Sequence, residues 1–330
     1  MTKHSQCLIQ SFMQHLRLRR YSERTLEIYE QVVRGYFALY PSLTVDNLRS
    51  YVAKSMDEDH LSRKTVNLHL SVLSSFASWL VKAGEIQSNP VRTIRRPKNS
   101  GRLPEFYKSD SMQDYFAQTQ YYAGEESFES FIDFLSAGQD GSDAAMHHAK
   151  ELYNRRLARL VVMTLFSLGV RRAELIGLNI SSYDKSRSVV TVRGKGDKTR
   201  EIPVTFALSQ EISLYLKAVE ALLGVKRSAE DPLFVTSSGG RLYPMAVDRC
   251  VKAELGEVKS IHGRLSPHVL RHTVATELLD DGADLNSIKE FLGHSSLAAT
   301  QVYTHNSIAK LKKIYESAHP RAKKGGNYGD

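Results

Sequence analysis

The chain has 330 residues, enough for two domains with separate hydrophobic cores. Its 45 Lys and Arg residues outnumber its 36 Asp and Glu residues, and the formal net charge of +9 is compatible with a polyanionic partner. The two cysteines, Cys7 and Cys250, argue against a disulfide framework, and no apolar run resembles a signal peptide or a membrane span. We therefore expect a cytoplasmic protein.

The positive charge is divided into two blocks. Residues 1–108 hold 17 Lys and Arg against 9 Asp and Glu, and residues 151–330 hold 27 against 19, so each block has a net charge of +8. Between them, residues 109–150 hold one Lys and eight acidic residues, a net charge of −7. Because phosphate groups repel carboxylates, we expect the acidic block to lie away from any nucleic-acid face.

Apolar residues recur at helical spacing through the first 84 residues and predict four helices. The expected boundaries are a start at Cys7, a cap at Ser22 or Thr25, a cap at Thr44, a cap at Ser62 and an end at Gly84. Four helices that each carry an apolar stripe predict a small bundle over residues 1–90. Arg63 and Lys64 lie on the polar side of the fourth helix, where a solvated face is the ordinary interpretation.

A basic segment, residues 91–105, follows the predicted bundle. Pro97 and Gly101 disfavour a helix there, so the segment is predicted to be an extended interdomain linker. Its basic residues are Arg92, Arg95, Arg96, Lys98 and Arg102. An ordinary flexible spacer is the alternative, but this density of positive charge favours contact with phosphate groups.

In the second half of the chain, two motifs present basic side chains. Arg171 follows Gly169 and a strongly apolar run, residues 160–168. The β-branched segments 188–193 and 201–205 flank a glycine-rich centre, which predicts a hairpin with Lys195 near its turn. Lys198 is the competing candidate for any role given to Lys195.

A third motif begins with Ser266 and Pro267, which predict the first turn of a helix. His268 and Arg271 then lie three residues apart on one face, near the positive end of the helix dipole, which makes a natural phosphate site. His272 faces away from Arg271 and is expected to be structural.

The last motif contains a histidine and a tyrosine. A short helix over residues 285–292 is predicted to end at Gly293, so that His294 begins a loop. Tyr303 follows after a third short segment, residues 296–302.

This set of side chains suits attack by a tyrosine oxygen on a phosphodiester without a metal, since no carboxylate cluster has metal-ligand spacing. Two guanidiniums can hold the non-bridging oxygens and offset the charge of a pentavalent transition state. A histidine can accept the proton of the phenol, whose ordinary pKa is about 10, and a lysine can protonate the departing 5′ oxygen. The expected product is a 3′-phosphotyrosyl link, which a second hydroxyl can reverse.

The chain resembles the tyrosine recombinases of the phage-integrase class, and most closely the bacterial Xer recombinases. The resemblance covers residues 5–108 and 150–322. Its most specific parts are Leu292-Gly-His-Ser-Ser-Leu-Ala-Ala-Thr-Gln-Val-Tyr303-Thr-His305 and the tail Ala318-His-Pro-Arg-Ala-Lys323. It implies that the catalytic residues are Arg171, Lys195, His268, Arg271, His294 and Tyr303. Glu174 matches an acidic position that steadies the basic groups of the site.

The resemblance also implies a fold that is mainly α with a small β-sheet. A four-helix SAM-like core-binding domain (1–90) and the basic linker (91–105) should precede an α+β tyrosine recombinase catalytic domain (106–320) and a flexible tail (321–330). Compact relatives lack an acidic insertion at about residues 121–148, for which a surface elaboration is favoured over a contact for a partner protein.

The implied function is site-specific DNA recombination through a Holliday junction, without metal or other cofactor, by a nucleoid-associated enzyme. The implied DNA contacts include Arg63, Lys64, Arg92, Arg95, Arg96 and Lys98. The Xer resemblance implies dimer resolution of chromosomes or plasmids during segregation and cell division. The expected assembly is a homo- or heterotetramer with a second recombinase, served by a septal DNA translocase and linked by an apolar helix over residues 307–318. A mobile-element integrase or invertase, a type IB topoisomerase and a non-catalytic DNA-binding regulator are the alternatives.

Overall fold

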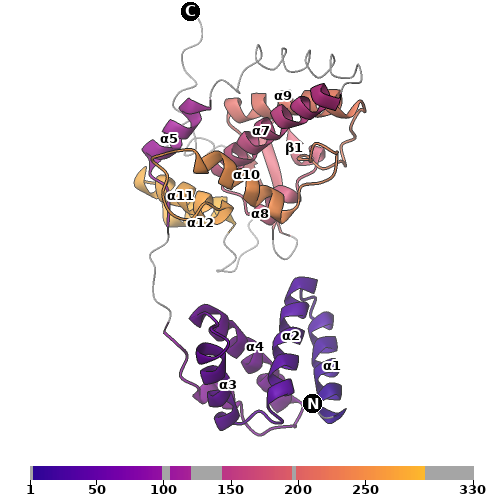
Figure 1. Cartoon of the computed structure of the whole chain (residues 1–330), viewed down its shortest axis with the longest axis vertical. Coiled ribbons are helices and arrows are strands. Elements are labelled where there is room, and N and C mark those ends of the chain that lie inside the picture. Colours follow the sequence, from indigo (N-terminus) through magenta and orange to yellow (C-terminus); the bar gives the residue numbers. More distant parts are fainter. Residues whose placement is uncertain (1–2, 99–104, 120–142, 195–197, 294–330) are drawn as a thin grey trace, which may run out of the picture. The chain divides into compact units, whose positions relative to one another are not determined.

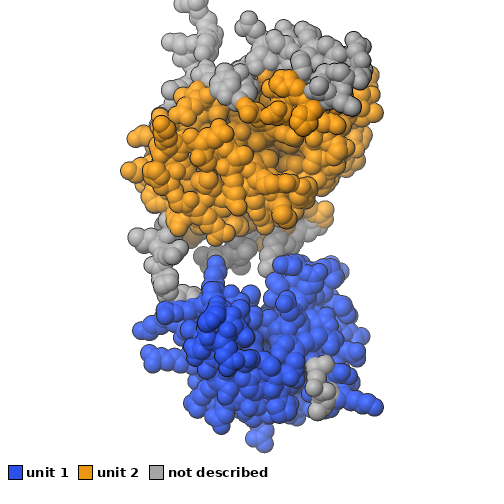
Figure 2. Space-filling view, in the orientation of Figure 1, with its two compact units in different colours: residues 1–102 blue, residues 103–330 orange. Residues whose placement is uncertain are grey.

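The computed structural model describes residues 3–98, 105–119, 143–194 and 198–293 (Figure 1). The chain divides into two compact units, residues 1–102 and residues 103–330 (Figure 2). Each unit has a separate hydrophobic core. No helix among these described ranges is long and apolar enough to cross a membrane.

Unit 1 is built from the four helices that the sequence predicts. They are α1 (Lys3–Leu18), α2 (Glu23–Leu39), α3 (Val45–Asp57) and α4 (Arg63–Lys82). The side chains of Ser22, Thr44 and Ser62 accept hydrogen bonds from backbone N–H groups three residues later, so the expected caps are confirmed, with Ser22 rather than Thr25 at the second helix. The apolar faces meet in a core that includes Phe12, Tyr36 and Phe76.

The segment after α4 packs on unit 1 instead of leaving it at residue 91. Pro90–Thr93 forms a 3₁₀ turn (η1), and Val91 and Ile94 are buried in the core of the bundle. The Asn89 amide donates to the backbone oxygen of Ser74 and to the hydroxyls of Ser74 and Ser78, which fixes the chain as it leaves α4. The prediction of an extended linker therefore misplaced its start, because two apolar residues in the basic segment bury more favourably than they hydrate.

Unit 2 surrounds one long helix. It contains α5 (Ser109–Gln118), α7 (Asp143–Leu168), α8 (Arg172–Ile176), α9 (Phe206–Leu223), α10 (Pro244–Gly256), α11 (Pro267–Asp280) and α12 (Leu285–Leu292). Helix α7 packs against α9, α10 and α11, and every residue from 157 to 170 is buried. A helix covered on all sides explains why the apolar residues of the run 160–168 are not confined to one stripe.

A small antiparallel sheet completes unit 2. The turn η4 (Ile180–Ser182) leads into β1 (Tyr183–Asp184), which pairs with β2 (Val189–Arg193), and β2 pairs with β3 (Thr199–Pro203). Arg193 opposite Thr199 is the last pair of β2 and β3, which confirms the predicted hairpin, and residues 195–197 lie outside the described residues. The mainly helical fold with a small sheet is confirmed. Most of the acidic insertion, and the tail from residue 294, lie outside the described residues.

Candidate active site

The site begins where α7 ends. Gly169 takes a left-handed backbone conformation (φ +56°), and a β-carbon there would lie 2.7 Å from Leu292 Cδ2, so α12 can approach this turn only at a glycine. The chain then turns into α8, and Arg171 is its N-cap residue. The backbone N–H of Arg171 donates to Glu174 Oε2 at 2.9 Å, and its Nη1 donates to Oε1 at 2.7 Å. The first turn of α8 therefore fixes both side chains.

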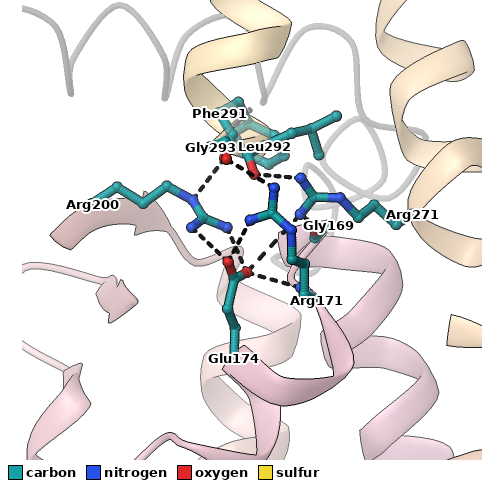
Figure 3. A network of polar contacts seen from close by, with 8 residues as sticks. All are labelled: Gly169, Arg171, Glu174, Arg200, Arg271, Phe291, Leu292 and Gly293. Atoms are coloured by element: carbon teal, nitrogen blue, oxygen red, sulfur yellow. Dashed lines mark hydrogen bonds and ion pairs between the residues drawn. The ribbon is translucent and has the colours of Figure 1, made fainter. Parts of the chain in front are cut away.

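Three guanidiniums surround the carboxylate of Glu174 (Figure 3). Besides Arg171, Arg200 on β3 donates to Oε1 from Nη1 at 3.2 Å and to Oε2 from Nη2 at 2.8 Å. Arg271 on α11 places Nη1 4.0 Å from Oε2. We call Arg171, Arg200, Arg271 and Glu174 the arginine cluster. With three positive groups and one negative group its formal charge is +2, largely inside the protein, which favours an anion as ligand.

The ionisation of the cluster follows from its geometry. Burial by itself would raise the pKa of Glu174, but the hydrogen bonds and charge of Arg200, followed by the hydrogen bonds of Arg171, outweigh it and lower the pKa to about 2. Burial, reinforced by the charge of Arg171, lowers the pKa of Arg271 to about 10. Glu174 is therefore ionised and Arg271 is protonated at neutral pH.

The last residues of α12 and its cap contact each arginine of the cluster in turn (Figure 3). Arg200 Nε donates to the backbone oxygen of Phe291 at 3.1 Å, Arg271 Nη2 donates to that of Leu292, and Arg171 Nη2 donates to that of Gly293 at 2.9 Å. These carbonyls end a helix and have no partner further along it, and the negative end of the helix dipole attracts cations. The cluster thus fixes the position from which the chain continues to His294.

Helix α11 supplies a candidate proton acceptor beside the cluster. Ser266 caps the helix, Pro267 occupies its first turn as predicted, and the exposed His268 follows. Partial burial, then the positive charge of Arg172 and of other basic neighbours, lowers the pKa of His268 below its ordinary 6.5. His268 is therefore neutral at pH 7 and can accept a proton.

The structure brings together part of the predicted catalytic set. Arg171, Glu174 and Arg271 share one cluster, and His268 stands one helical turn before Arg271 on α11. Lys195, His294 and Tyr303 lie outside the described residues.

The residues that precede Lys195 and His294 do reach the cluster. A β-carbon at Gly194 would lie 3.8 Å from Arg200 Nη1 and 3.8 Å from Glu174 Oε1, and one at Gly293 would lie 2.8 Å from Arg200 Nη1. Both catalytic candidates therefore directly follow a glycine that lies near the Arg200 guanidinium.

Arg200 is the residue that the sequence prediction missed. The predicted strand began at Glu201, which left Arg200 among the charged residues of the turn, but β3 begins at Thr199. Arg200 is only 7% exposed and lies on the buried side of the strand with Ile202. Alternation counted back from Ile202 places a basic residue on the core face, and that signal was available in the sequence.

The predicted DNA-binding residues of unit 1 gather along the start of α4. Arg63, Lys64, Arg92, Arg95, Arg96 and Lys98 are all exposed. Arg63 donates to the backbone oxygen of Lys98 at 3.2 Å, and Arg96 donates to the Ser71 hydroxyl at 2.9 Å. These bonds hold the basic segment along α4, so two of the four guanidiniums in this set also have a structural role.

Known proteins match the chain over nearly its whole length. A family model described as the phage integrase family matches residues 139–310, and one described as its N-terminal SAM-like domain matches residues 8–84. The tyrosine recombinase XerC of Alcanivorax borkumensis is 33% identical over 96% of this chain and 94% of its own. XerC of Corynebacterium efficiens is 34% identical over 91% of this chain and 87% of its own.

Solved structures share the fold at lower identity. The Tn1549 transposon integrase bound to transposon right end DNA is 17% identical, with a TM-score of 0.61 over 93% of this chain and 98% of its own. A lambda integrase dimer bound to a COC′ core site is 15% identical, with a TM-score of 0.60 over 100% of this chain and 80% of its own. From the family models and the XerC relatives, the chain belongs to the phage integrase family of tyrosine recombinases.

Proposed function

We propose that this protein is an Xer-type site-specific recombinase that cleaves and rejoins DNA through a 3′-phosphotyrosyl intermediate on Tyr303. The observation that carries the proposal is the arginine cluster, which presents an excess of buried positive charge beside a neutral histidine at a helix N-terminus. Its XerC relatives cover almost the entire chain.

Arg171 and Arg271 are the groups that hold the scissile phosphate. A phosphodiester carries one negative charge, and a pentavalent transition state carries about one more, so charge complementarity to a cluster of +2 improves as the reaction proceeds. Because the carboxylate of Glu174 and the end of α12 already orient the two guanidiniums, little reorganisation is needed when the phosphate arrives.

His268, His294, Lys195 and Tyr303 complete the proposed chemistry. His268 accepts the proton of the Tyr303 phenol as its oxygen attacks phosphorus, and the P–O bond to the 5′ oxygen breaks. Lys195 donates a proton to that departing oxygen, and His294 adds a further hydrogen bond to the phosphate. A 5′ hydroxyl of the partner strand then attacks the phosphotyrosyl bond, which re-forms a phosphodiester and frees the phenol. The DNA bond energy is conserved, so the reaction needs no nucleotide or other cofactor.

The basic residues along α4 suit a DNA backbone. Arg63, Lys64, Arg92, Arg95, Arg96 and Lys98 are exposed on one packed substructure, so they can contact several phosphates together. The lambda integrase tetramer bound to a Holliday junction shares the fold (TM-score 0.59, 15% identity). By analogy, we propose that four protomers act on two DNA sites through such a junction, as a homotetramer or as a heterotetramer with a second recombinase.

The proposed cellular role is resolution of chromosome or plasmid dimers at segregation and cell division. The XerC relatives support this assignment over that of a mobile-element integrase or an invertase. In the same proposal, the recombinase is associated with the nucleoid and acts together with a septal DNA translocase. Mapping the DNA sites bound in cells would separate the roles, since dimer resolution requires a site on the host chromosome or a resident plasmid and an integrase requires an element end.

A nicked suicide substrate tests the enzymatic proposal directly. Cleavage releases a short fragment, so the covalent protein–DNA adduct accumulates and can be resolved on a denaturing gel. The wild-type protein should form the adduct, whereas Tyr303→Phe should bind the site with similar affinity and form none. An adduct in the Phe variant would assign the nucleophile elsewhere, and formation of a junction from two labelled sites would separate a recombinase from a type IB topoisomerase.

A further inference from the structure

Arg200 is the most completely bonded guanidinium of the arginine cluster. Its Nη1 and Nη2 form a bidentate pair with Glu174, and its Nε donates to the carbonyl of Phe291 (Figure 3). The residue is 7% exposed, whereas the side chain of Arg171 is 34% exposed. Arg271 is as buried as Arg200, at 6% exposed, but its hydrogen bonds within the described residues come from Nη1 and Nη2 only, whereas all three nitrogens of Arg200 donate to protein oxygens.

Two glycines, Gly293 and Gly194, lie next to the Arg200 guanidinium. A β-carbon at Gly293 would lie 2.8 Å from its Nη1, 3.0 Å from its Cζ and 3.2 Å from its Nε, and Gly293 also has a left-handed backbone (φ +66°). A β-carbon at Gly194 would lie 3.8 Å from Nη1. A glycine at position 293 adopts this conformation without strain and lets the backbone before His294 lie against the guanidinium, whereas a β-carbon there would require the guanidinium to shift.

We propose that Arg200 is a positioning residue for strand cleavage, which holds the Glu174 carboxylate behind Arg171 and Arg271 and fixes the end of α12 from which His294 follows. The inference rests on the proposed function, because it assigns how the arginines of that same site are oriented. Arg200 does not touch the phosphate in this account. It acts through Glu174 and through the carbonyl of Phe291.

The charges of the cluster explain why the contacts of Arg200 with Glu174 and Phe291 should affect cleavage. Without Arg200, both oxygens of Glu174 would be left to Arg171 and Arg271, which are the groups that the phosphate needs. The carboxylate would then compete with the substrate for those guanidiniums, and the formal charge of the cluster would fall from +2 to +1. The carbonyl of Phe291 would also lose its donor, and the backbone at Gly293 would lose the surface it rests on.

If Arg200 served stability alone, its replacement would lower the melting temperature and leave the cleavage rate of the folded protein unchanged. Removal of one partner of a buried ion pair is strongly destabilising where the other charge is left uncompensated. In Arg200→Met, Glu174 keeps two cationic neighbours, so no isolated charge is buried. We therefore expect this variant to fold and to fail in the chemical step.

The test compares Arg200→Met, Arg200→Lys and a matched control in the full-length protein. Arg187→Met is the control, since Arg187 forms an exposed bidentate pair with Glu201 (2.8 Å and 2.8 Å) next to the same hairpin. Site binding is measured by fluorescence anisotropy, and the cleavage rate by single-turnover adduct formation on the suicide substrate. Misplacement of reacting groups by about 1 Å costs about 10²-fold in rate, so we expect that loss in Arg200→Met with site affinity unchanged within about threefold.

Arg200→Lys keeps the charge but not the fork of donors, and should lose an intermediate amount of rate with an unchanged melting temperature. Arg187→Met should match the wild type. The double variant Glu174→Gln/Arg200→Met should lose much less cleavage rate than the product of the two single-variant losses, since the two side chains act as one unit. The loss should persist on a 5′-bridging phosphorothiolate substrate, whose leaving group needs no proton.

Wild-type cleavage rates in both Arg200 variants would overturn the inference. So would full recovery on the phosphorothiolate, because Arg200 would then act through the lysine of the hairpin turn. If Arg200→Met does not fold, Arg200→Lys decides the question through the same rate and melting measurements. Absence of adduct with the wild-type protein would instead refute the proposed function, so the two failures are distinguishable.

Discussion

Glu174→Gln removes the negative charge of the arginine cluster and keeps the shape of the side chain. The pKa of Glu174 falls from its ordinary 4.5 to about 2 in the folded protein, and a shift of that size corresponds to about 3 kcal/mol of stabilisation of the carboxylate. The variant would bury three guanidiniums with no carboxylate between them. We therefore expect the free energy of unfolding of unit 2 to fall by up to about 3 kcal/mol at pH 7.

The difference in stability between wild type and Glu174→Gln should depend on pH. Because the pKa of Glu174 is depressed in the folded state, its stabilisation is complete above pH 4.5 and is lost as the pH falls toward about 2. The difference between wild type and Glu174→Gln should therefore narrow as the pH is lowered below 4.5. Urea unfolding followed by far-ultraviolet circular dichroism at a series of pH values measures this difference.

The chain contains its own control for this experiment. Its single tryptophan, Trp79, packs in unit 1 against Phe12 and Phe76, so tryptophan fluorescence follows that unit alone. The fluorescence transition should be the same in both proteins while the circular dichroism transition of unit 2 shifts. A difference at pH 7 below about 0.5 kcal/mol, or one that stays constant through acid pH, would refute the electrostatic account of the cluster.

Four further predictions follow from the same site. Arg171→Ala and Arg271→Ala should each lower the rate of adduct formation by about 10²- to 10³-fold, as loss of a preorganised donor does, and a loss in binding alone would contradict their role. The pKa of His268 is lowered, so the acid limb of the cleavage rate should have its midpoint below pH 6.5 and should disappear in His268→Gln; a limb that survives assigns the proton acceptor elsewhere. Lys195→Ala should recover on the phosphorothiolate substrate, and lack of recovery would point to Lys198 or another acid. Deletion of residues 307–330 should spare binding to one site and weaken synapsis, so unchanged recombination by the truncated chain would contradict a tail that links protomers.

Local signals predicted most of the elements that shape the site. The caps at Thr44, Ser62 and Ser266 and the end of α12 at Gly293 depend on a few neighbouring residues and were placed correctly from the sequence, and Ser22 was one of the two candidates for the cap of α2. These features are local because a side-chain oxygen bonds an N–H three residues away or because a glycine adopts a left-handed conformation. The hairpin of β2 and β3 was also predicted from local signals, the β-branched residues of its strands and the glycines between them.

Long-range packing decided what the sequence reasoning missed. The burial of Val91 and Ile94 depends on the surface of α3 and α4, which composition does not reveal. The role of Arg200 depends on the register of β2 with β3 and on the approach of α12, more than ninety positions later in the chain. A charged residue in a short predicted turn is ordinarily solvated, so Arg200 was not predicted to belong to the site.

The hydrogen-bonding capacity of arginine explains why the cluster can be ordered before DNA binds. A guanidinium has five N–H groups, and the side-chain bonds of Arg171 and of Arg271 within the described residues use two on each, one from Nη1 and one from Nη2. The carbonyls of Gly293 and Leu292 can therefore keep their bonds while other N–H groups face a phosphate. A lysine at either position would keep the charge but has three donors on one nitrogen, and these cannot hold a fixed backbone oxygen and grip two phosphate oxygens in a planar fork. In the proposed mechanism, α12 and Glu174 contribute to catalysis by fixing the orientation of the guanidiniums.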